Sequence, residues 1–170
     1  MIMSKNKSKI TPIDFDTGVG EIIPATQEAR TNDGFDGQIR KVEKESLTTF
    51  KRIVGEQLDS ELAQNDIFPT DGEVFVFIMQ YFGSEKEYLR RDVDNMAKTT
   101  LDLLRNRFYN DDSQVKTLLV GKKIEARVPQ NFAYIAVKKL SATQDVDALK
   151  ISGLERSITM FQELKSKKVL

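Results

Sequence analysis

The chain has 170 residues, with 26 basic and 26 acidic side chains, and it contains no cysteine, histidine or tryptophan. Its length and its 39% hydrophobic content predict one globular domain with a hydrophobic core. The missing residue types exclude disulfides, thiol nucleophiles, cysteine-based zinc sites and any catalytic triad that needs histidine. Catalysis by this chain must therefore rest on Asp, Glu, Lys, Arg, Ser, Thr or Tyr, or on a hard cation such as Mg²⁺ held by oxygen ligands.

Neither a membrane span nor a secretory signal is expected. The longest apolar run, residues 74–79, is too short to cross a bilayer, and the basic N-terminus has no apolar stretch behind it. The lack of cysteine is compatible with a reducing cytoplasm, which is the location we expect. Residues 86–139 hold 12 basic and 7 acidic side chains, whereas residues 1–85 hold 9 and 15. This asymmetry is either a chance fluctuation or the mark of a local anionic partner.

The first half of the chain predicts an irregular segment, then a helix, then a strand. Residues 1–45 lack periodicity and are rich in Gly, Asp and Asn, which favours loops with at most one short strand. From Ser46 onward, apolar residues recur every three or four positions up to Leu62, as in a helix. Gly55 weakens that helix by up to about 1 kcal/mol, so tertiary packing must support it. Residues 73–82 are almost wholly apolar and β-branched or aromatic, which predicts a strand buried on both faces.

The second half predicts one further main helix, two strands and a terminal helix. Residues 94–107 carry a helical apolar stripe, and residues 114–120 and 132–137 have the pattern of strands that residues 121–129 join as a hairpin. Residues 141–148 have the composition of a linker, and an amphipathic helix is expected after them. Its apolar positions are Leu154, Ile158, Phe161 and Leu164.

This order of elements predicts an α+β fold in which a small mixed β-sheet packs against two main helices, with an extra C-terminal helix. We expect three parts: an irregular N-terminal segment at residues 1–45, a core at 46–140, and a C-terminal linker and helix at 141–170.

Acidic and basic residues are concentrated around the start of the second main helix. Asp92 and Asp94 are two positions apart, so they point the same way in extended chain that enters the helix. Lys98 follows Asp94 by one helical turn, and Asp102 follows Lys98 by another. At about 100° per residue, these helical positions and Arg105 share the face opposite the apolar stripe.

Each part of this pattern also has a purely structural interpretation. Asp92 or Asp94 is a good helix N-cap, and Asp94, Lys98 and Asp102 are spaced for ordinary surface ion pairs. The pair Asp111-Asp112 is typical of a turn. An EF-hand calcium loop is excluded, because the required Gly and Glu positions hold Ala97 and Leu103.

Three spaced motifs, in residues 91–98, 101–104 and 109–115, together resemble the RusA family of Holliday junction resolvases. That family shows Arg-Asp-x-Asp-Asn, a Lys three residues later, Asp-x-Leu on the same helix, and Asp-Asp-x-Gln-Val at the next strand. The resemblance implies a homodimeric, Mg²⁺-dependent endonuclease that cuts four-way DNA junctions, with Mn²⁺ as a possible substitute. It implies metal-binding carboxylates and a catalytic lysine at the following positions: Asp92, Asp94, Asp112 and Lys98. Supporting residues fall on Asn95, Asp102, Asp111 and Gln114.

The chemistry of the residues agrees with this resemblance. Carboxylates that hold Mg²⁺ can activate water and neutralise a phosphate without histidine. Basic side chains suited to the DNA backbone flank the motif at Arg90, Arg91, Lys122 and Lys123. The Pro-Pro-Ser-x-Asn loop with which the family usually opens is not found in residues 1–45. Two alternatives remain open: a non-catalytic protein that binds branched DNA, and a structural or interaction protein whose acidic residues are caps and ion pairs.

Overall fold

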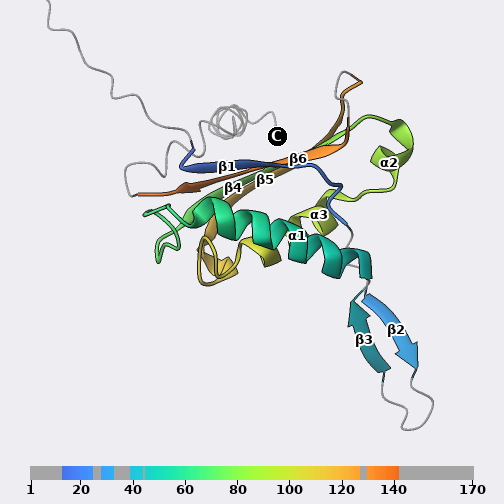
Figure 1. Cartoon of the computed structure of the whole chain (residues 1–170), viewed down its shortest axis with the longest axis horizontal. Helices are drawn as coiled ribbons and strands as arrows, with labels where there is room; N and C mark the ends of the chain where they lie inside the picture. Colours follow the sequence, from blue (N-terminus) through green and yellow to red (C-terminus); the bar gives the residue numbers. More distant parts are fainter. Residues whose placement is uncertain (1–12, 25–27, 33–38, 44, 127–129, 142–170) are drawn as a thin grey trace, which may run out of the picture.

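A four-stranded mixed sheet is the centre of the molecule. The structure is a computed structural model that describes residues 13–24, 28–32, 39–43, 45–126 and 130–141. The strands lie in the order β1-β6-β4-β5, and β4 is parallel to β5 but antiparallel to β6 (Figure 1). Their bounds are Phe15–Val19 for β1, Phe132–Lys139 for β6, Val74–Phe82 for β4 and Val115–Ile124 for β5. The mixed sheet confirms the predicted α+β class.

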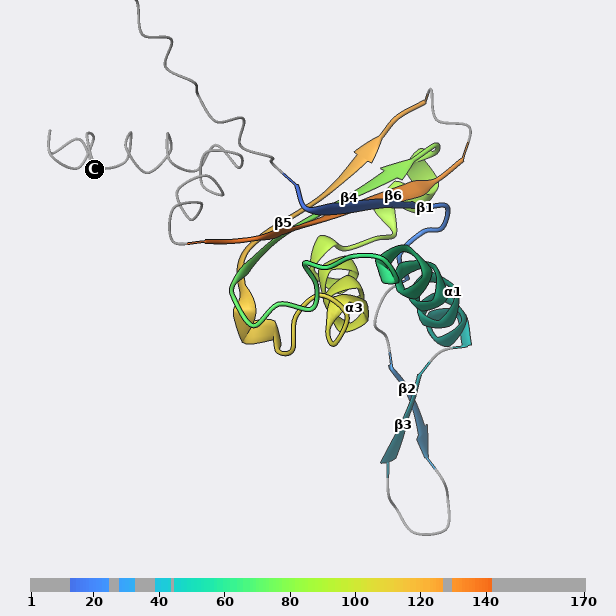
Figure 2. The same cartoon turned by 60° about the vertical axis from the view of Figure 1, so that its left-hand side comes forward.

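Two helices, α1 (Glu45–Leu62) and α3 (Val93–Leu104), cover one face of this sheet (Figures 1 and 2). Their apolar stripes meet the inward side chains of the strands in one core. Two shorter elements complete the described chain: the five-residue helix α2 (Glu85–Leu89) and the 3₁₀ turn η1 (Asp112–Gln114). No helix among the described residues is long and apolar enough to span a membrane. The core is built mainly from the following side chains: Phe50, Val54, Leu58, Val76, Ile78, Met96, Leu104, Phe108, Ile135 and Val137.

β4 is a strand, as its apolar sequence predicted, but its burial is complete only on the face toward the helices, because Phe77, Met79 and Tyr81 on the other face are partly buried. It lies between β6 and β5, so both of its edges are hydrogen bonded. Val76 and Ile78 face the helices and are fully buried. Phe75 points to the other face, where it packs with Leu140 and the partly buried Phe77 in a smaller cluster.

Residues 1–45 were expected to hold at most one short strand, but the structure has three strands there. β1 pairs antiparallel with β6, with Phe15 opposite Val137 and Val19 opposite Ala133. β2 (Glu28–Asn32) and β3 (Ile39–Glu43) pair with each other and project away from the main sheet (Figure 2). Each strand has only five residues, which is too short for a period to stand out from the surrounding Gly and Asp. The expected division at residues 45 and 140 stays a prediction, but β1 belongs to the main sheet.

The prediction that residues 121–129 join two paired strands as a hairpin was also wrong. β5 and β6 follow each other in the chain, yet β4 lies between them and pairs with both. The most apolar strand takes the central position because it alone is suited to burial on both faces. Helix α3 ends at Leu104, three residues earlier than predicted, and Asn106 then adopts a φ of 65°, which Asn tolerates better than most residues. The linker and helix predicted within 141–170 lie outside the described residues, apart from Ser141.

The tertiary support that Gly55 requires comes from Arg107. A Cβ at position 55 would lie 2.8 Å from a terminal nitrogen of the Arg107 guanidinium, which packs against this buried glycine. Arg107 donates from Nε to Asp59 Oδ1 at 2.7 Å and from Nη1 to the Leu103 carbonyl at 2.9 Å. One side chain thus joins α1 to the end of α3, which holds α3 in place on the sheet.

Candidate active site

A pocket of about 600 Å³ lies between α3 and β5 and gathers most of the acidic residues singled out in the sequence. Asp94, Lys98 and Asp102 line it from successive turns of α3, and Asp112 lines it from η1. Apolar side chains make up the rest of the wall: Val93, Ala97, Leu101, Leu118 and Val120. The fold therefore brings Asp112 to the charged face of α3, although the two are separated in sequence by the end of the helix and a turn.

The ion pairs that the structural interpretation of these residues requires are not found among the described residues. Within the described part of the chain, Lys98 forms no ion pair with Asp94 or Asp102, although both lie one helical turn away. By contrast, Arg52 and Glu56 do form such a pair on α1 at 3.3 Å. Asp94, Lys98 and Asp102 are exposed and line the pocket, so their charges are available to a bound ion or phosphate.

Asp92 is placed at the start of α3, outside the lining of this pocket. It is the N-cap residue, with an extended backbone (φ −99°, ψ 135°), but its side chain makes no capping hydrogen bond. Its carbonyl accepts the bond from Met96 N at 3.2 Å that opens the helix. Among the described residues, no three acidic side chains lie close enough to form a ready-made metal cage. The structure thus brings Asp94 and Asp112 to one pocket, whereas Asp92 is outside its lining and its side chain makes no capping hydrogen bond.

The two residues of the Asp111-Asp112 pair have different surroundings. Asp111 Oδ1 accepts a hydrogen bond from Ser113 N at 2.8 Å, while Gln114 Oε1 accepts one from Asp111 N at 3.0 Å, which closes a capping box. The bonds from Ser113 and the nearby Arg105 guanidinium hold the pKa of Asp111 below its usual range. Asp111 therefore shapes the turn, and Asp112 is the member of the pair that reaches the pocket.

Tyr109 is the first residue of the third sequence motif, but no role was predicted for it. It is fully buried, and its hydroxyl donates to the Leu101 carbonyl at 3.1 Å. Burial, with the nearby Asp112 and Asp102 carboxylates, raises the pKa of Tyr109. An aromatic residue directly before the Asn-Asp-Asp turn was the only sequence signal for it.

Comparison with protein-family models matches residues 20–136 to the family described as endodeoxyribonuclease RusA. The chain belongs to the RusA endodeoxyribonuclease family. The match extends from the end of β1 into β6, so it includes α3, η1, β5 and every residue of the acidic pocket. It confirms the resemblance found in the three motifs. A search of curated proteins found no match.

Membership of the RusA family makes a divalent metal the expected cofactor, because these nucleases are metal-dependent in general. The donors in the pocket fit such an ion. Asp94, Asp102 and Asp112 offer only carboxylate oxygens, which are the ligands that Mg²⁺ and Mn²⁺ prefer. Among the described residues, no three of these carboxylates already form a group that could hold an ion.

The four basic residues predicted to contact DNA have unequal surroundings. Arg90 and Lys123 are exposed, and Lys123 is 3.6 Å from Glu125. Arg91 is 3.5 Å from Glu87, and it lines a second pocket, of about 750 Å³, between the segment after β1 and the start of α1. Lys122 is half-buried and donates hydrogen bonds to two backbone carbonyls.

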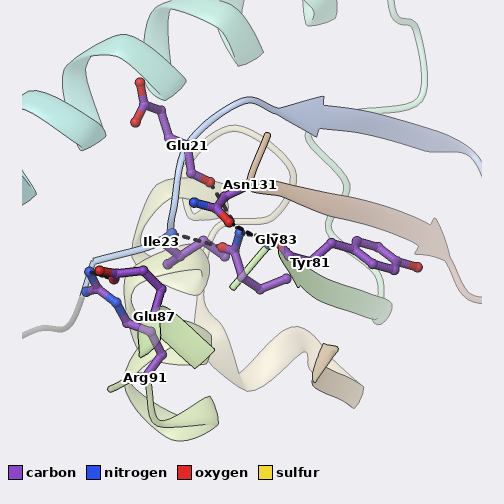
Figure 3. A network of polar contacts seen from close by, with 8 residues as sticks. Glu21, Ile23, Tyr81, Gly83, Glu87, Arg91 and Asn131 are labelled. Atoms are coloured by element: carbon purple, nitrogen blue, oxygen red, sulfur yellow. Dashed lines mark hydrogen bonds and ion pairs between the residues drawn. The ribbon is translucent and has the colours of Figure 1, made fainter. Parts of the chain in front are cut away.

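The segment that follows β1 runs beside α3 without the family's usual loop motif. Gln80, fully buried in β4, accepts a hydrogen bond from Ile23 N at 2.9 Å, and Thr99 on α3 donates to the Pro24 carbonyl at 2.9 Å. Figure 3 shows Arg91 close to this segment, and Arg91 and Glu21 line the same pocket. β1 ends one residue before the matched region begins, and the segment after it carries Ile22-Ile23-Pro24 and no Pro-Pro-Ser-x-Asn motif.

Proposed function

We propose that this RusA-family protein is a Mg²⁺-dependent endonuclease that resolves four-way DNA junctions, as a cytoplasmic homodimer acting in DNA recombination and repair. One observation carries the proposal: Asp94 and Asp112, from separate segments, meet Lys98 at one pocket without an ion pair among the described residues that would neutralise them. Among the described residues, such an arrangement adds no ion pair to the stability of the fold. It is useful where a cation and a phosphate are to be bound.

In this proposal Asp92, Asp94 and Asp112 hold Mg²⁺, for which Mn²⁺ substitutes. The bound ion supplies an activated water and neutralises charge on the scissile phosphate. Asp92 is suited to join the site because its extended backbone and lack of a capping bond leave its carboxylate available. The ammonium of Lys98 then stabilises the negative charge that develops on the phosphate oxygens. Asp92, Asp94, Lys98 and Asp112 are thus the proposed catalytic residues.

Contacts to the DNA backbone are assigned to Arg90, Arg91 and Lys123, which lie around the turn before α3 and on β5. Such contacts release counterions, so binding should weaken steeply with salt. A four-way junction has approximate two-fold symmetry, and a C₂ dimer would therefore present one site to each of two opposed strands. This match of symmetries is the reason for proposing a dimer.

The proposal is tested by incubating the protein with a synthetic four-way junction in Mg²⁺, Mn²⁺ or EDTA, with linear duplex of the same sequence as the control. We expect paired cuts on opposed strands of the junction, only with metal. Asp92→Asn and Asp94→Asn should abolish cleavage but leave junction binding unchanged or tighter, because each removes metal-ligand charge and no phosphate contact. Full activity in both variants would refute their role as metal ligands.

Metal binding has a readout that does not depend on cleavage. An ion that binds only the folded state stabilises it by about 2.7 kcal/mol at one hundred times its dissociation constant. Thermal unfolding of the wild-type protein should therefore shift upward when Mg²⁺ or Mn²⁺ is added. Asp94→Asn and Asp112→Asn should lose this shift, and an unchanged shift in both would place the ion elsewhere.

A second candidate function is non-catalytic binding of branched DNA. It is favoured by the absence, among the described residues, of three acidic side chains already grouped for a metal. The same assay separates the two candidates. Specific junction binding without cleavage, in both Mg²⁺ and Mn²⁺, would establish the second.

A further inference from the structure

Lys122 points from β5 to the turn between α2 and α3, where it binds main-chain oxygens. Its Nζ donates to the Tyr88 carbonyl at 2.8 Å and to the Arg91 carbonyl at 2.7 Å. The same ammonium lies 4.2 Å from the centre of the Tyr88 ring. Both hydrogen bonds are short and charge-assisted, a class of bond about twice as strong as one between neutral groups. Lys122 is therefore a cross-link between a strand and a turn more than thirty residues away in sequence.

Its neighbour Lys123 has a different environment. Successive residues of a strand point to opposite faces of the sheet, so the two ammonium groups leave β5 in opposite directions. The side chain of Lys123 is 60% exposed and meets only Glu125, at 3.6 Å, among the contacts that the structure gives it. The side chain of Lys122 is half-buried and uses two of its three donors on carbonyls. These adjacent residues of equal charge should therefore serve different purposes.

The turn that Lys122 holds leads directly into Asp92. Arg91, whose carbonyl accepts the shorter bond, is the residue immediately before it. Few apolar contacts fix this turn: α2 has five residues, none of them buried, and Leu89 at its end is 68% exposed. The bonds from Lys122 add a polar anchor to the edge contact of the Tyr88 ring with the buried Phe82, whose ring centres are 6.0 Å apart.

The same strand also forms the wall of the acidic pocket. Leu118 and Val120 precede Lys122 by four and two residues, so all three leave β5 on one face, and the first two line the pocket opposite Asp94. By holding the Arg91 carbonyl, Lys122 fixes the start of α3 relative to that wall. Two carboxylates near the start of α3, at positions 92 and 94, are proposed metal ligands.

We propose that Lys122 is a positioning residue for the metal site and makes no contact with DNA. Its bonds to the Tyr88 and Arg91 carbonyls set where Asp92 and the first turn of α3 lie relative to β5. Loss of the bonds should weaken metal binding, in the way that outer-shell groups of metal sites contribute about 10–100-fold to affinity. This inference rests on the proposed metal-dependent function and assigns to Lys122 a part within it.

The test compares Lys122→Met with Lys123→Met, two variants that remove the same charge from adjacent positions. Mn²⁺ affinity is measured without DNA by electron paramagnetic resonance, and junction binding is measured in EDTA over a range of salt concentrations. Lys122→Met should raise the Mn²⁺ dissociation constant at least about tenfold and leave the salt dependence of junction binding unchanged. Lys123→Met should do the opposite: unchanged Mn²⁺ affinity, weaker junction binding and a shallower salt dependence.

Each result bears on the inference. Wild-type Mn²⁺ affinity in Lys122→Met, or a salt dependence altered as in Lys123→Met, would overturn it. If Lys122→Met does not fold, Lys122→Gln retains one donor group and should show an intermediate Mn²⁺ affinity with wild-type junction binding; wild-type Mn²⁺ affinity in that variant would also refute the role. Failure of the wild-type protein to bind Mn²⁺ would refute the proposed function together with this inference. Equal binding by the wild-type protein and Lys122→Met would refute the inference alone.

Discussion

Replacement of Lys98 by alanine separates a catalytic role of this residue from a structural one. Lys98 lies on the exposed face of α3, at the pocket shared by Asp94 and Asp112. No ion pair among the described residues involves its ammonium. A residue that holds only a surface ion pair would be expected to show that pair, as Arg52 does with Glu56.

The structure predicts a small effect of Lys98→Ala on stability and a large one on cleavage. No described ion pair is lost and alanine is a good helix former, so the free energy of unfolding should change by less than about 0.5 kcal/mol. If the ammonium stabilises the phosphate in the transition state, the cleavage rate should fall roughly 10²–10³-fold, or about 2.7–4 kcal/mol. Lys98→Arg keeps the charge but changes its reach and geometry, so it should restore little activity.

The assay is single-turnover cleavage of a four-way junction with protein in excess, so that product release does not limit the rate. Binding is measured separately in EDTA. Arg52→Ala is the control, because it removes one positive charge from an exposed helix position that makes a real ion pair. It should cost at most about 0.5 kcal/mol of stability and leave cleavage unchanged. A Lys98→Ala rate within a few-fold of the wild-type rate would refute the catalytic role.

Three further predictions follow from other contacts. Asp112→Asn should abolish cleavage in the junction assay, whereas Asp111→Asn, which keeps an oxygen to accept the Ser113 bond, should retain it; equal loss in both would contradict their different assignments. Arg107→Met should cost about 1 kcal/mol in denaturant unfolding near neutral pH. Arg107 lowers the pKa of Asp59, so the part of this destabilisation that comes from the ion pair should disappear as pH falls below about 4. A destabilisation that does not change with pH would argue against the ion pair. Gln80→Leu should destabilise the protein by about 1–3 kcal/mol, because it leaves a buried main-chain N–H without its acceptor; unchanged thermal unfolding would contradict that bond.

The sequence alone predicted the helices and strands whose apolar patterns are long and unambiguous. Helix α1 runs from Glu45 to Leu62, one residue from the predicted start, because its apolar stripe persists over 18 residues. β4 was correctly predicted as a strand because polar residues are almost absent from it, although its second face is only partly buried. The three motifs in residues 91–115 together were sufficient to suggest the RusA family, since each involves residues close together in the chain. Local spacing determines all of these features, so a reader of the sequence can see them.

Strand order and the grouping of the site residues were decided by contacts between distant segments. Nothing local indicates that β4 separates β5 from β6, that β1 pairs with β6, or that Asp112 reaches the pocket on α3 while Asp111 caps a turn. Likewise, nothing in the sequence distinguishes the roles of Lys122 and Lys123, which are adjacent residues of the same type. Only the pleat of β5 and the approach of the turn before α3 distinguish them. Burial of the most apolar strand and satisfaction of main-chain hydrogen bonds act across the whole chain, and for this reason the tertiary structure was needed to place the site.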